Sequence, residues 1–290
     1  MRDRLSRPTL GGPGQPGGTA FDGEPWWCFL VPWRNRALIW QLARRELLGR
    51  YRGSWLGTAW MFLTPLILLG VYTVVFRHVF KTQWSPGQNP SDVDFALQLF
   101  AGLAIFQCVA DLWSRAPRLI VDQANLVTKV RFPLSTLGWA ATFAALLHLL
   151  GALLVWLAAC LAAGHRPQLY WLALPSAVLP LLPWLLGVAW LLSSIGVYLR
   201  DLSHLSGLVL TGVLFLSPVF YPTTALPAWL APFTGWIPLA APIEALRLMV
   251  FGATWPDFLA LGWILLAGIA VASLGAIISA RLRPGFADLL

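Results

Sequence analysis

The chain has 290 residues, of which 58% are hydrophobic and only 11% charged, and its mean hydropathy is +0.70. This composition lies far from the averages of soluble domains, so it excludes an ordinary soluble globular protein and indicates one membrane-embedded unit. The formal net charge is +8. We do not favour a nucleic-acid-binding patch as its explanation, because the cations lie beside the ends of apolar stretches and not on a soluble face.

Six stretches of the chain are apolar and long enough to span a membrane. A bilayer core of about 30 Å needs about 20 apolar residues in a helix. The stretches are residues 55–76, 95 to about 113, 134–164, a segment within 169–199, a segment that begins near 205, and 258–280. The sequence therefore predicts an all-α integral membrane protein with six transmembrane helices.

The lysines and arginines gather on alternate connectors between these stretches. Of the 20, nine precede the first span, four lie between spans two and three, one lies between spans four and five, and two follow the last span. The opposite, outer connectors hold only Arg77, Lys81, Arg166 and Arg247. Cationic residues near the ends of spans are retained on the cytoplasmic side. The pattern predicts a multi-pass protein with both termini in the cytoplasm.

The two ends of the chain differ in composition from the spans. Residues 11–18 are rich in Gly and Pro and cannot bury apolar surface. We therefore predict that residues 1–33 form a disordered cytoplasmic tail and a membrane-interface anchor. The six-span domain then covers residues 34–283, and residues 284–290 form a cytoplasmic C-terminal tail.

Residues 35–50 are expected to form a helix before the first span. Asn35 is a favourable N-cap, Glu46 and Arg50 have the i,i+4 spacing of residues on one helix face, and Gly49 and Gly53 are stop signals. The short apolar face and the many charges suit a helix that lies on anionic lipid headgroups. The alternative is a helix with lipid on one flank and a cytoplasmic protein on the other.

The connector between spans two and three, residues 114–131, carries mixed charge. Asp122 and Asn125 are suitable caps for short helical turns, and Pro133 ends one helix or begins the next. Two interpretations stay open. The charges either solvate a hairpin, or they belong to a short cytoplasmic helix that a soluble motor protein pushes.

Residues 217–243, between spans five and six, are apolar but repeatedly interrupted by proline. Non-helical backbone at membrane depth is tolerated only against protein or a water-filled cavity. We predict a re-entrant hairpin of two short helices near the outer face. It would bring to a pore mouth the aromatic residues Phe220, Tyr221, Trp229, Phe233 and Trp236. The alternative is an aromatic belt at the membrane interface.

Little in the sequence points to catalysis. No Gly-x-x-x-x-Gly-Lys-Ser/Thr loop is present to bind ATP, and the four histidines lack metal-ligand spacing. Asp92 and Asp94 have the Asp-x-Asp form of some metal-dependent glycosyltransferases, but no second catalytic group accompanies them. His148 lies deep in a span, where we expect it to be hydrogen-bonded within the bundle. We predict a non-enzymatic chain with no catalytic residue, no metal and no cofactor of its own.

Three connector segments have distinctive sequences. Arg-Arg-Glu-Leu-Leu-Gly-Arg-Tyr-Arg-Gly-Ser-Trp-Leu-Gly fills residues 44–57, and Asn-Leu-Val-Thr-Lys-Val-Arg-Phe-Pro fills residues 125–133. Tyr-Leu-Arg-Asp at 198–201 is followed by Leu-Ser-Pro-Val-Phe-Tyr-Pro at 216–222. In their order and topological places, these segments resemble the membrane subunits of ABC exporters that move O-antigen, capsule or teichoic acid chains. The resemblance covers about residues 34–283.

That resemblance implies a type-2 ABC-transporter permease. It would act in the bacterial inner membrane as a homodimer, with two copies of a separate soluble ATPase that binds ATP and Mg²⁺. Its cargo would be a polysaccharide on a polyprenyl-diphosphate lipid, threaded through a channel between the two protomers. Aromatic residues suit that cargo, because sugar rings present apolar C–H faces that stack on aromatic rings.

The resemblance also implies roles for individual residues. The residues expected to couple the chain to the ATPase are Arg44, Arg45, Glu46, Arg50, Arg52, Asp122, Asn125, Lys129, Arg131, Arg200 and Asp201. The residues expected to line the channel or its outer gate are Tyr72, Phe76, Phe220, Tyr221, Trp229, Phe233 and Trp236.

Two other functions stay open. One is a type-2 ABC permease for a small drug or peptide, which would share the fold and the ATPase. The other is a non-transporting membrane scaffold for envelope assembly, which would need no ATPase. Copurification with a nucleotide-binding subunit separates the scaffold from a permease.

Overall fold

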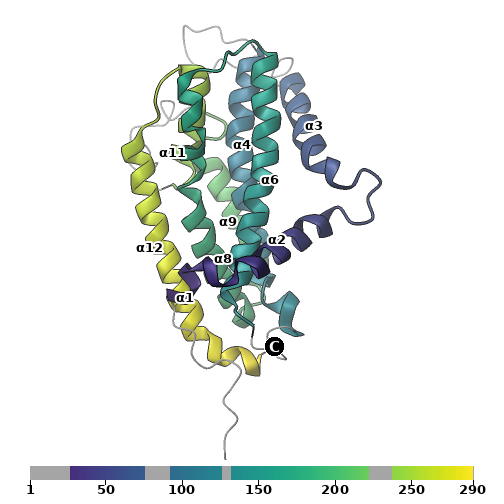
Figure 1. The fold of residues 1–290 in the computed structure, drawn as a ribbon, viewed down its shortest axis with the longest axis vertical. Coiled ribbons are helices and arrows are strands. Elements are labelled where there is room, and N and C mark those ends of the chain that lie inside the picture. Colours follow the sequence, from purple (N-terminus) through teal and green to yellow (C-terminus); the bar gives the residue numbers. More distant parts are fainter. Residues whose placement is uncertain (1–26, 76–91, 126–131, 222–236, 290) are drawn as a thin grey trace, which may run out of the picture.

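The computed structural model describes residues 27–75, 92–125, 132–221 and 237–289, and within them the chain is helical with no strand. Long helices run side by side along the long axis of the molecule, and α2 (Arg36–Arg50) lies across them near one end (Figure 1). The predicted all-α class is confirmed.

Five helical segments are long and apolar enough to cross a membrane. They are Gly57–Val75, Val93–Arg118, Ser135–Ala162, Leu169–Tyr198 and Phe258–Phe286. Each agrees with one of the predicted apolar stretches. Five of the six predicted stretches are therefore confirmed as helices of spanning length, as expected of a multi-pass membrane protein.

Each of these segments contains one main helix, and short turns extend most of them. The main helices are α3 (Trp60–Val75), α4 (Asp92–Arg115), α6 (Ser135–Ala162), α8 (Leu181–Tyr198) and α12 (Phe258–Leu282). The extensions are η2 (Gly57–Ala59), η4 (Ala116–Arg118), η6 (Leu169–Ala173), α7 (Leu174–Val178) and η9 (Arg283–Asp288).

The fifth predicted stretch corresponds to α9 (Leu202–Leu216), which is shorter than the others. Its 15 residues make a helix about 22 Å long, at 1.5 Å per residue, against a bilayer core of about 30 Å. The helix ends at Leu216, and the next residue, Ser217, has an extended ψ of 146°. The cause is Pro218, because a proline disfavours helical conformation in the residue before it. A sixth crossing stays a prediction.

The two ends of the bundle are structurally different. We call the end that carries α2, η4, η5 (Val121–Gln123) and η9 the basic end, and the opposite end the far end. The described chain begins with α1 (Trp27–Leu30) and finishes with η9, both at the basic end (Figure 1). Toward the far end lie α11 (Ala240–Arg247) and the π-helix η8 (Leu248–Gly252), just before α12 begins. Exposed arginines at the basic end include Arg36, Arg44, Arg45, Arg118, Arg200 and Arg281.

Helices α8 and α12 pack backbone to backbone at two glycines. A Cβ atom added at Gly187 would lie 2.6 Å from the carbonyl carbon of Val271, and one added at Gly275 would lie 2.6 Å from the Gly187 oxygen. Closer to the basic end, the Ser279 hydroxyl donates to the Trp190 carbonyl at 2.9 Å. Small residues and hydrogen bonds between helices are the means by which helices associate in lipid, where apolar burial gives little driving force.

Both described ends of the chain are fixed to the bundle. The Phe29 side chain is buried, and the Trp139 indole N–H donates to the Phe29 carbonyl at 2.8 Å. At the other terminus Phe286 is fully buried, and the Tyr198 hydroxyl donates to the Leu282 carbonyl at 2.9 Å. η9 (Arg283–Asp288), which includes residues 284–288 of the predicted C-terminal tail, therefore folds under the bundle.

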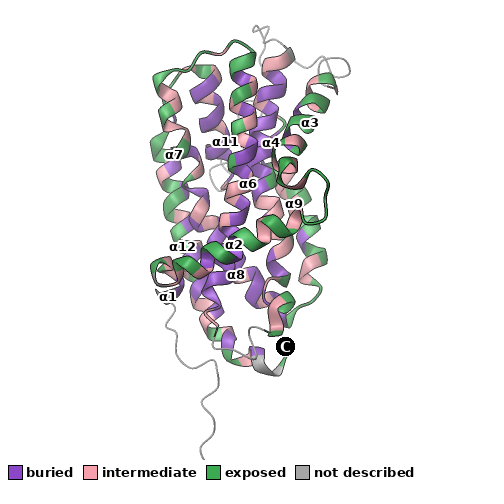
Figure 2. Ribbon diagram, turned by 45° about the vertical axis from the view of Figure 1, so that its right-hand side comes forward, coloured by how far each residue is buried: buried purple, intermediate pink, exposed green. Residues whose placement is uncertain are grey.

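Two helices leave broad apolar faces uncovered. In α3 only Pro65 and Leu69 are buried, and in α9 only Ser206 is (Figure 2). Leu208 and Phe215 of α9 are 74% and 65% exposed. Faces this apolar need cover from lipid or from another protein.

The Gly187 contact predicts a specific loss of stability. Gly187→Ala should lower the free energy of unfolding in detergent by about 1–3 kcal/mol, because the added methyl overlaps the α12 backbone. The matched control is Gly262→Ala on α12, where an added Cβ meets nothing within 4 Å. Thermal unfolding measures both. Equal melting temperatures for the two variants would show that α8 and α12 do not pack this closely.

Candidate functional site

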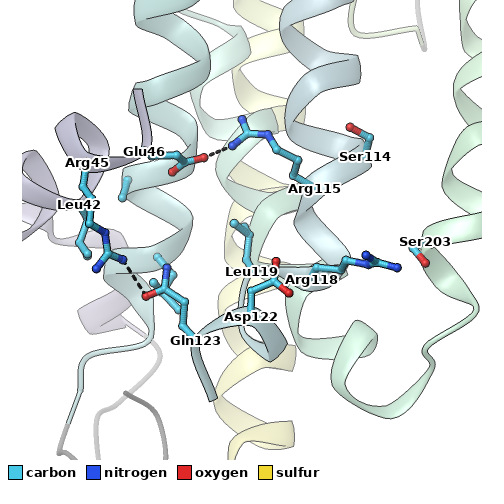
Figure 3. Close-up of a pocket in the computed structure, with 12 residues that line it drawn as sticks. Leu42, Arg45, Glu46, Ser114, Arg115, Arg118, Leu119, Asp122, Gln123 and Ser203 are labelled. Carbon is cyan, nitrogen blue, oxygen red and sulfur yellow. Dashed lines mark hydrogen bonds and ion pairs between the residues drawn. The ribbon is translucent and has the colours of Figure 1, made fainter. Parts of the chain in front are cut away.

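Helix α2 is joined to α4 by four charged side chains near the basic end. Arg50 pairs with Asp111 at 2.6 Å, Asp111 pairs in turn with Arg115 at 2.6 Å, and Arg115 pairs with Glu46. The pair between Arg115 and Glu46 is drawn in Figure 3. We call Glu46, Arg50, Asp111 and Arg115 the charge cluster. It alternates in sign and is formally neutral.

The spacing of the charges explains how the cluster forms. Glu46 and Arg50 are four residues apart on α2, and Asp111 and Arg115 are four apart on α4, so each pair projects from one helix face. Where the helices meet, each acid faces an arginine of the other helix. The four side chains are 20–29% exposed, so water screens them in part and each single pair contributes about 1 kcal/mol or less.

A tyrosine–histidine contact continues this junction to α6. The Tyr51 hydroxyl, directly after α2, is hydrogen-bonded to His148 Nδ1 at 3.2 Å. Partial burial raises the pKa of the Tyr51 phenol; the nearby Arg50 opposes that shift, and Asp111 adds to it. The phenol therefore stays protonated at neutral pH. The expectation that His148 is hydrogen-bonded within the bundle is confirmed.

Beside the charge cluster lies a cavity of about 540 Å³. Its polar lining comes from α2, the end of α4, η4, η5 and the start of α9 (Figure 3). The lining residues are Leu42, Arg45, Glu46, Ser114, Arg115, Arg118, Leu119, Asp122, Gln123, Leu137, Ala140 and Ser203. Across it, Arg45 of α2 donates to the Gln123 side-chain oxygen at 3.1 Å.

A helix is present where the sequence predicts the interface helix. α2 begins directly after Asn35, although the Asn35 side chain forms no capping hydrogen bond. Its buried residues are Ile39, Leu42 and Ala43, which face the bundle. Its position at a membrane interface stays a prediction.

Most residues predicted to couple to an ATPase are exposed at or near the basic end. The exposed ones are Arg44, Arg45, Arg52, Asp122, Asn125, Arg200 and Asp201. Three separate segments supply them, and Arg45, Asp122 and Ser203 from those segments line the same cavity. Glu46 and Arg50 are instead half-buried and paired with α4. Lys129 and Arg131 lie outside the described residues.

The predicted channel and gate residues fall in two places. Tyr72 of α3 lines a pocket of about 300 Å³ together with Gln107 and His148. Phe220 and Tyr221 follow α9: the ring centroids of Phe220 and Phe215 are 6.2 Å apart, and the Tyr221 hydroxyl donates to the Phe215 carbonyl at 2.7 Å. Outside the described residues lie Phe76, Trp229, Phe233 and Trp236.

In the sequence, Arg115 is one of the four cations between spans two and three, and Asp111 lies at the end of the second apolar stretch. Both belong to the charge cluster. Their i,i+4 spacing at the end of an apolar helix is a signal in the sequence that marks them as a pair. Which residues of α2 they would contact is a long-range pairing that this spacing does not encode.

The described fold and its charged end define a multi-pass helical membrane protein. The sequence model of the ABC-2 type transporter family matches residues 37–251. An O-antigen export system permease protein, RfbA, from Myxococcus xanthus is 32% identical over 194 residues, which is 67% of this chain and 72% of that protein. Two proteins of the same name from Klebsiella pneumoniae are 24% and 22% identical over 86% of this chain and 93% of theirs. The chain therefore belongs to the ABC-2 type transporter family.

The charge cluster predicts a measurable coupling between α2 and α4. In a double-mutant cycle, Glu46→Gln and Arg115→Gln should be coupled by about 1 kcal/mol in the free energy of unfolding. The reason is that either single change leaves the other charge half-buried without this partner. Chemical unfolding in detergent measures the cycle, and Arg44→Gln, at an exposed position of α2, is the control. A coupling energy of zero would mean that the pair does not hold α2 in place.

Proposed function

We propose that the chain is the membrane permease subunit of an ABC exporter that moves a polyprenyl-diphosphate-linked, O-antigen-like polysaccharide across the bacterial inner membrane. The observation that carries the proposal is the set of three relatives named O-antigen export permeases, two of them matched over 86% of this chain. The resemblance of the three connector segments to polysaccharide exporters agrees with it.

The energy for export comes from a separate ATPase. The sequence contains no ATP-binding loop of the Gly-x-x-x-x-Gly-Lys-Ser/Thr form. ATP and Mg²⁺ therefore bind to the partner, of which two copies serve a homodimer of this chain. The exposed charges of α2, η5 and the start of α9, among them Arg45, Asp122 and Arg200, form the docking surface, and so do Lys129 and Arg131.

Motion of the ATPases enters the bundle through α2. Glu46 and Arg50 of α2 are paired with charged residues of α4. A displacement of α2 therefore moves α4 as well. The contact between Tyr51 and His148 carries the same displacement to α6. α2 is thus both an interface helix on the inner leaflet and the element that transmits motion of the ATPases to α4 and α6.

The basic end faces the cytoplasm. Its exposed arginines follow the rule that cations near the ends of spans stay on the cytoplasmic side. α9 then crosses the membrane as the fifth of six spans, and residues 217–243 form the re-entrant hairpin that completes its outer half. Both termini are cytoplasmic.

The translocation path lies between two copies of the chain. The uncovered apolar faces of α3 and α9 are the surfaces that a second protomer covers in part. Tyr72 and Phe76 of the α3 region line the channel, and the outer gate consists of Phe220, Tyr221, Trp229, Phe233 and Trp236. Aromatic rings stack on the C–H faces of successive sugars without requiring one sugar sequence.

Reversal of the Arg45 charge is expected to uncouple the two subunits. Arg45→Glu places a carboxylate beside the Gln123 side-chain oxygen and reverses one charge of the docking surface. Glycan export in cells should fall about tenfold or more, which corresponds to about 1.4 kcal/mol of lost interaction, while the amount of protein in the membrane stays normal. The control is Arg281→Glu, an exposed arginine of α12 at the same end. Normal export in the Arg45 variant would remove this residue from the docking surface.

Copurification tests the function as a whole. The chain is expressed with a candidate ATPase from the same genome, and hydrolysis is measured with and without polyprenyl-linked glycan. We expect a stable complex of two chains and two ATPases whose hydrolysis responds to the glycan. A response to small drugs or peptides instead would favour the drug or peptide permease, and failure to bind any ATPase would favour the scaffold.

A further inference from the structure

Arg247 is a charged side chain in the interior of the bundle. It is the last residue of α11, and only 4% of it is exposed. By sequence it counts among the charges of an outer connector, so its burial is a finding of the structure. Removing a guanidinium from water is costly unless its N–H groups find other acceptors. A charge in this position therefore has to be held by its surroundings.

Three backbone carbonyls hold the guanidinium. Nη1 donates to the Pro218 carbonyl at 2.7 Å, Nη2 donates to the Val219 carbonyl at 2.8 Å, and Nε donates to the Gln98 carbonyl at 3.1 Å. The first two acceptors follow α9, and the third belongs to α4. One side chain of α11 thus ties together three segments of the bundle, which the planar fork of an arginine allows and a lysine does not.

Arg247 binds the backbone directly after α9, where the helix is interrupted. The helix ends at Leu216, and the Val219 N–H donates back to the Ser217 carbonyl at 2.7 Å. Carbonyls beyond a helix end have no helical partner and lie at the negative end of the helix dipole. A buried cation can donate hydrogen bonds to these carbonyls, and its positive charge is favourable at the negative end of the dipole.

A glycine of α4 makes room for this arrangement. A Cβ atom at Gly102 would lie 3.0 Å from Arg247 Nη2 and 3.2 Å from Val219 Cα. α4 therefore contributes both an acceptor, the Gln98 carbonyl, and the space in which the guanidinium meets the segment after α9.

Phe220 and Tyr221 directly follow Pro218 and Val219, whose carbonyls accept from Arg247. Val219 is fully buried, whereas Phe220 is 37% exposed, so the chain passes from the interior to the surface within one residue. We infer that Arg247 is the positioning residue of the outer gate: by holding the carbonyls of Pro218 and Val219, it sets where Phe220 and Tyr221 stand. The gate itself rests on the function proposed above.

The arrangement also connects the two ends of the protein. Gln98 and Gly102 lie toward one end of α4, and Asp111 and Arg115 of the charge cluster lie toward the other, about 20 Å away along the helix. α4 is therefore linked to α2 at the basic end and to the segment before the gate at the far end. Arg247 passes a movement of α4 to Phe220.

The test measures access to the gate position. The full chain carries Phe220→Cys in a Cys28→Ser background, because the other native cysteines, Cys108 and Cys160, are buried. Whole cells are treated with a membrane-impermeant maleimide, and the labelling rate is compared between the wild-type arginine and Arg247→Lys. Gly102→Ala gives a second perturbation of the same contact from the side of α4.

Two controls separate gate position from general loosening. Arg166→Lys makes the same substitution at an exposed arginine, after α6. Gln168→Cys, in the same connector, reports reagent access away from the gate, and melting temperature reports overall stability.

We expect Arg247→Lys to raise the labelling rate at Phe220→Cys about tenfold, the change that loss of one hydrogen bond from a charged donor produces in an equilibrium. Gly102→Ala should raise it too, and labelling at Gln168→Cys should stay constant. Unchanged labelling at Phe220→Cys in both variants would overturn the assignment. So would the absence of both variants from the membrane, since Arg247 would then be a folding residue. Labelling needs neither glycan nor ATP hydrolysis, so its outcome is separate from whether the chain exports polysaccharide.

Discussion

A lipid bilayer offers no water to backbone polar groups, so the protein itself has to satisfy every N–H and C=O at membrane depth. Helix interiors meet this requirement automatically, and the helix ends do not. The chain places charged side chains at those ends. Asp257 accepts from the backbone N–H groups of Leu259 and Ala260 where α12 begins, and Arg247 donates to the carbonyls that follow α9. Several of its few charges are thus structural parts of the bundle.

α4 is the element on which the two candidate regions depend. It packs against α3, α6, α9 and α11, and it carries Asp111 and Arg115 at one end and the Gln98 acceptor at the other. Packed interiors are not continuously deformable, so a movement imposed at one end of such a helix is transmitted along it. The proposed function needs this kind of link, because it places ATP hydrolysis on one side of the membrane and the gate on the other.

The sequence predicted the spanning helices well, because the length of an apolar stretch is a local property. The helix after Asn35 was predicted from other local signals, the N-cap residue and the i,i+4 spacing of Glu46 and Arg50, although the capping hydrogen bond is absent. The partners of Glu46 were not predictable, because Arg115 lies 69 residues away and nothing local encodes their contact. Arg247 was assigned to an outer connector, because a single sequence does not show that the carbonyls after α9 surround it. The gate role of Phe220 and Tyr221 stays a prediction, as do the gate residues that lie outside the described part of the chain.

The most direct test of the account is transport in proteoliposomes that contain this chain and its ATPase, with the ATPase outside and polyprenyl-diphosphate-linked polysaccharide in the outer leaflet. The measurement is the fraction of glycan that becomes protected from an added glycan-degrading enzyme. The account predicts protection that requires ATP and that disappears when the ATPase carries a substitution in its nucleotide-binding loop. Glycan that stays fully accessible while ATP is hydrolysed would contradict it.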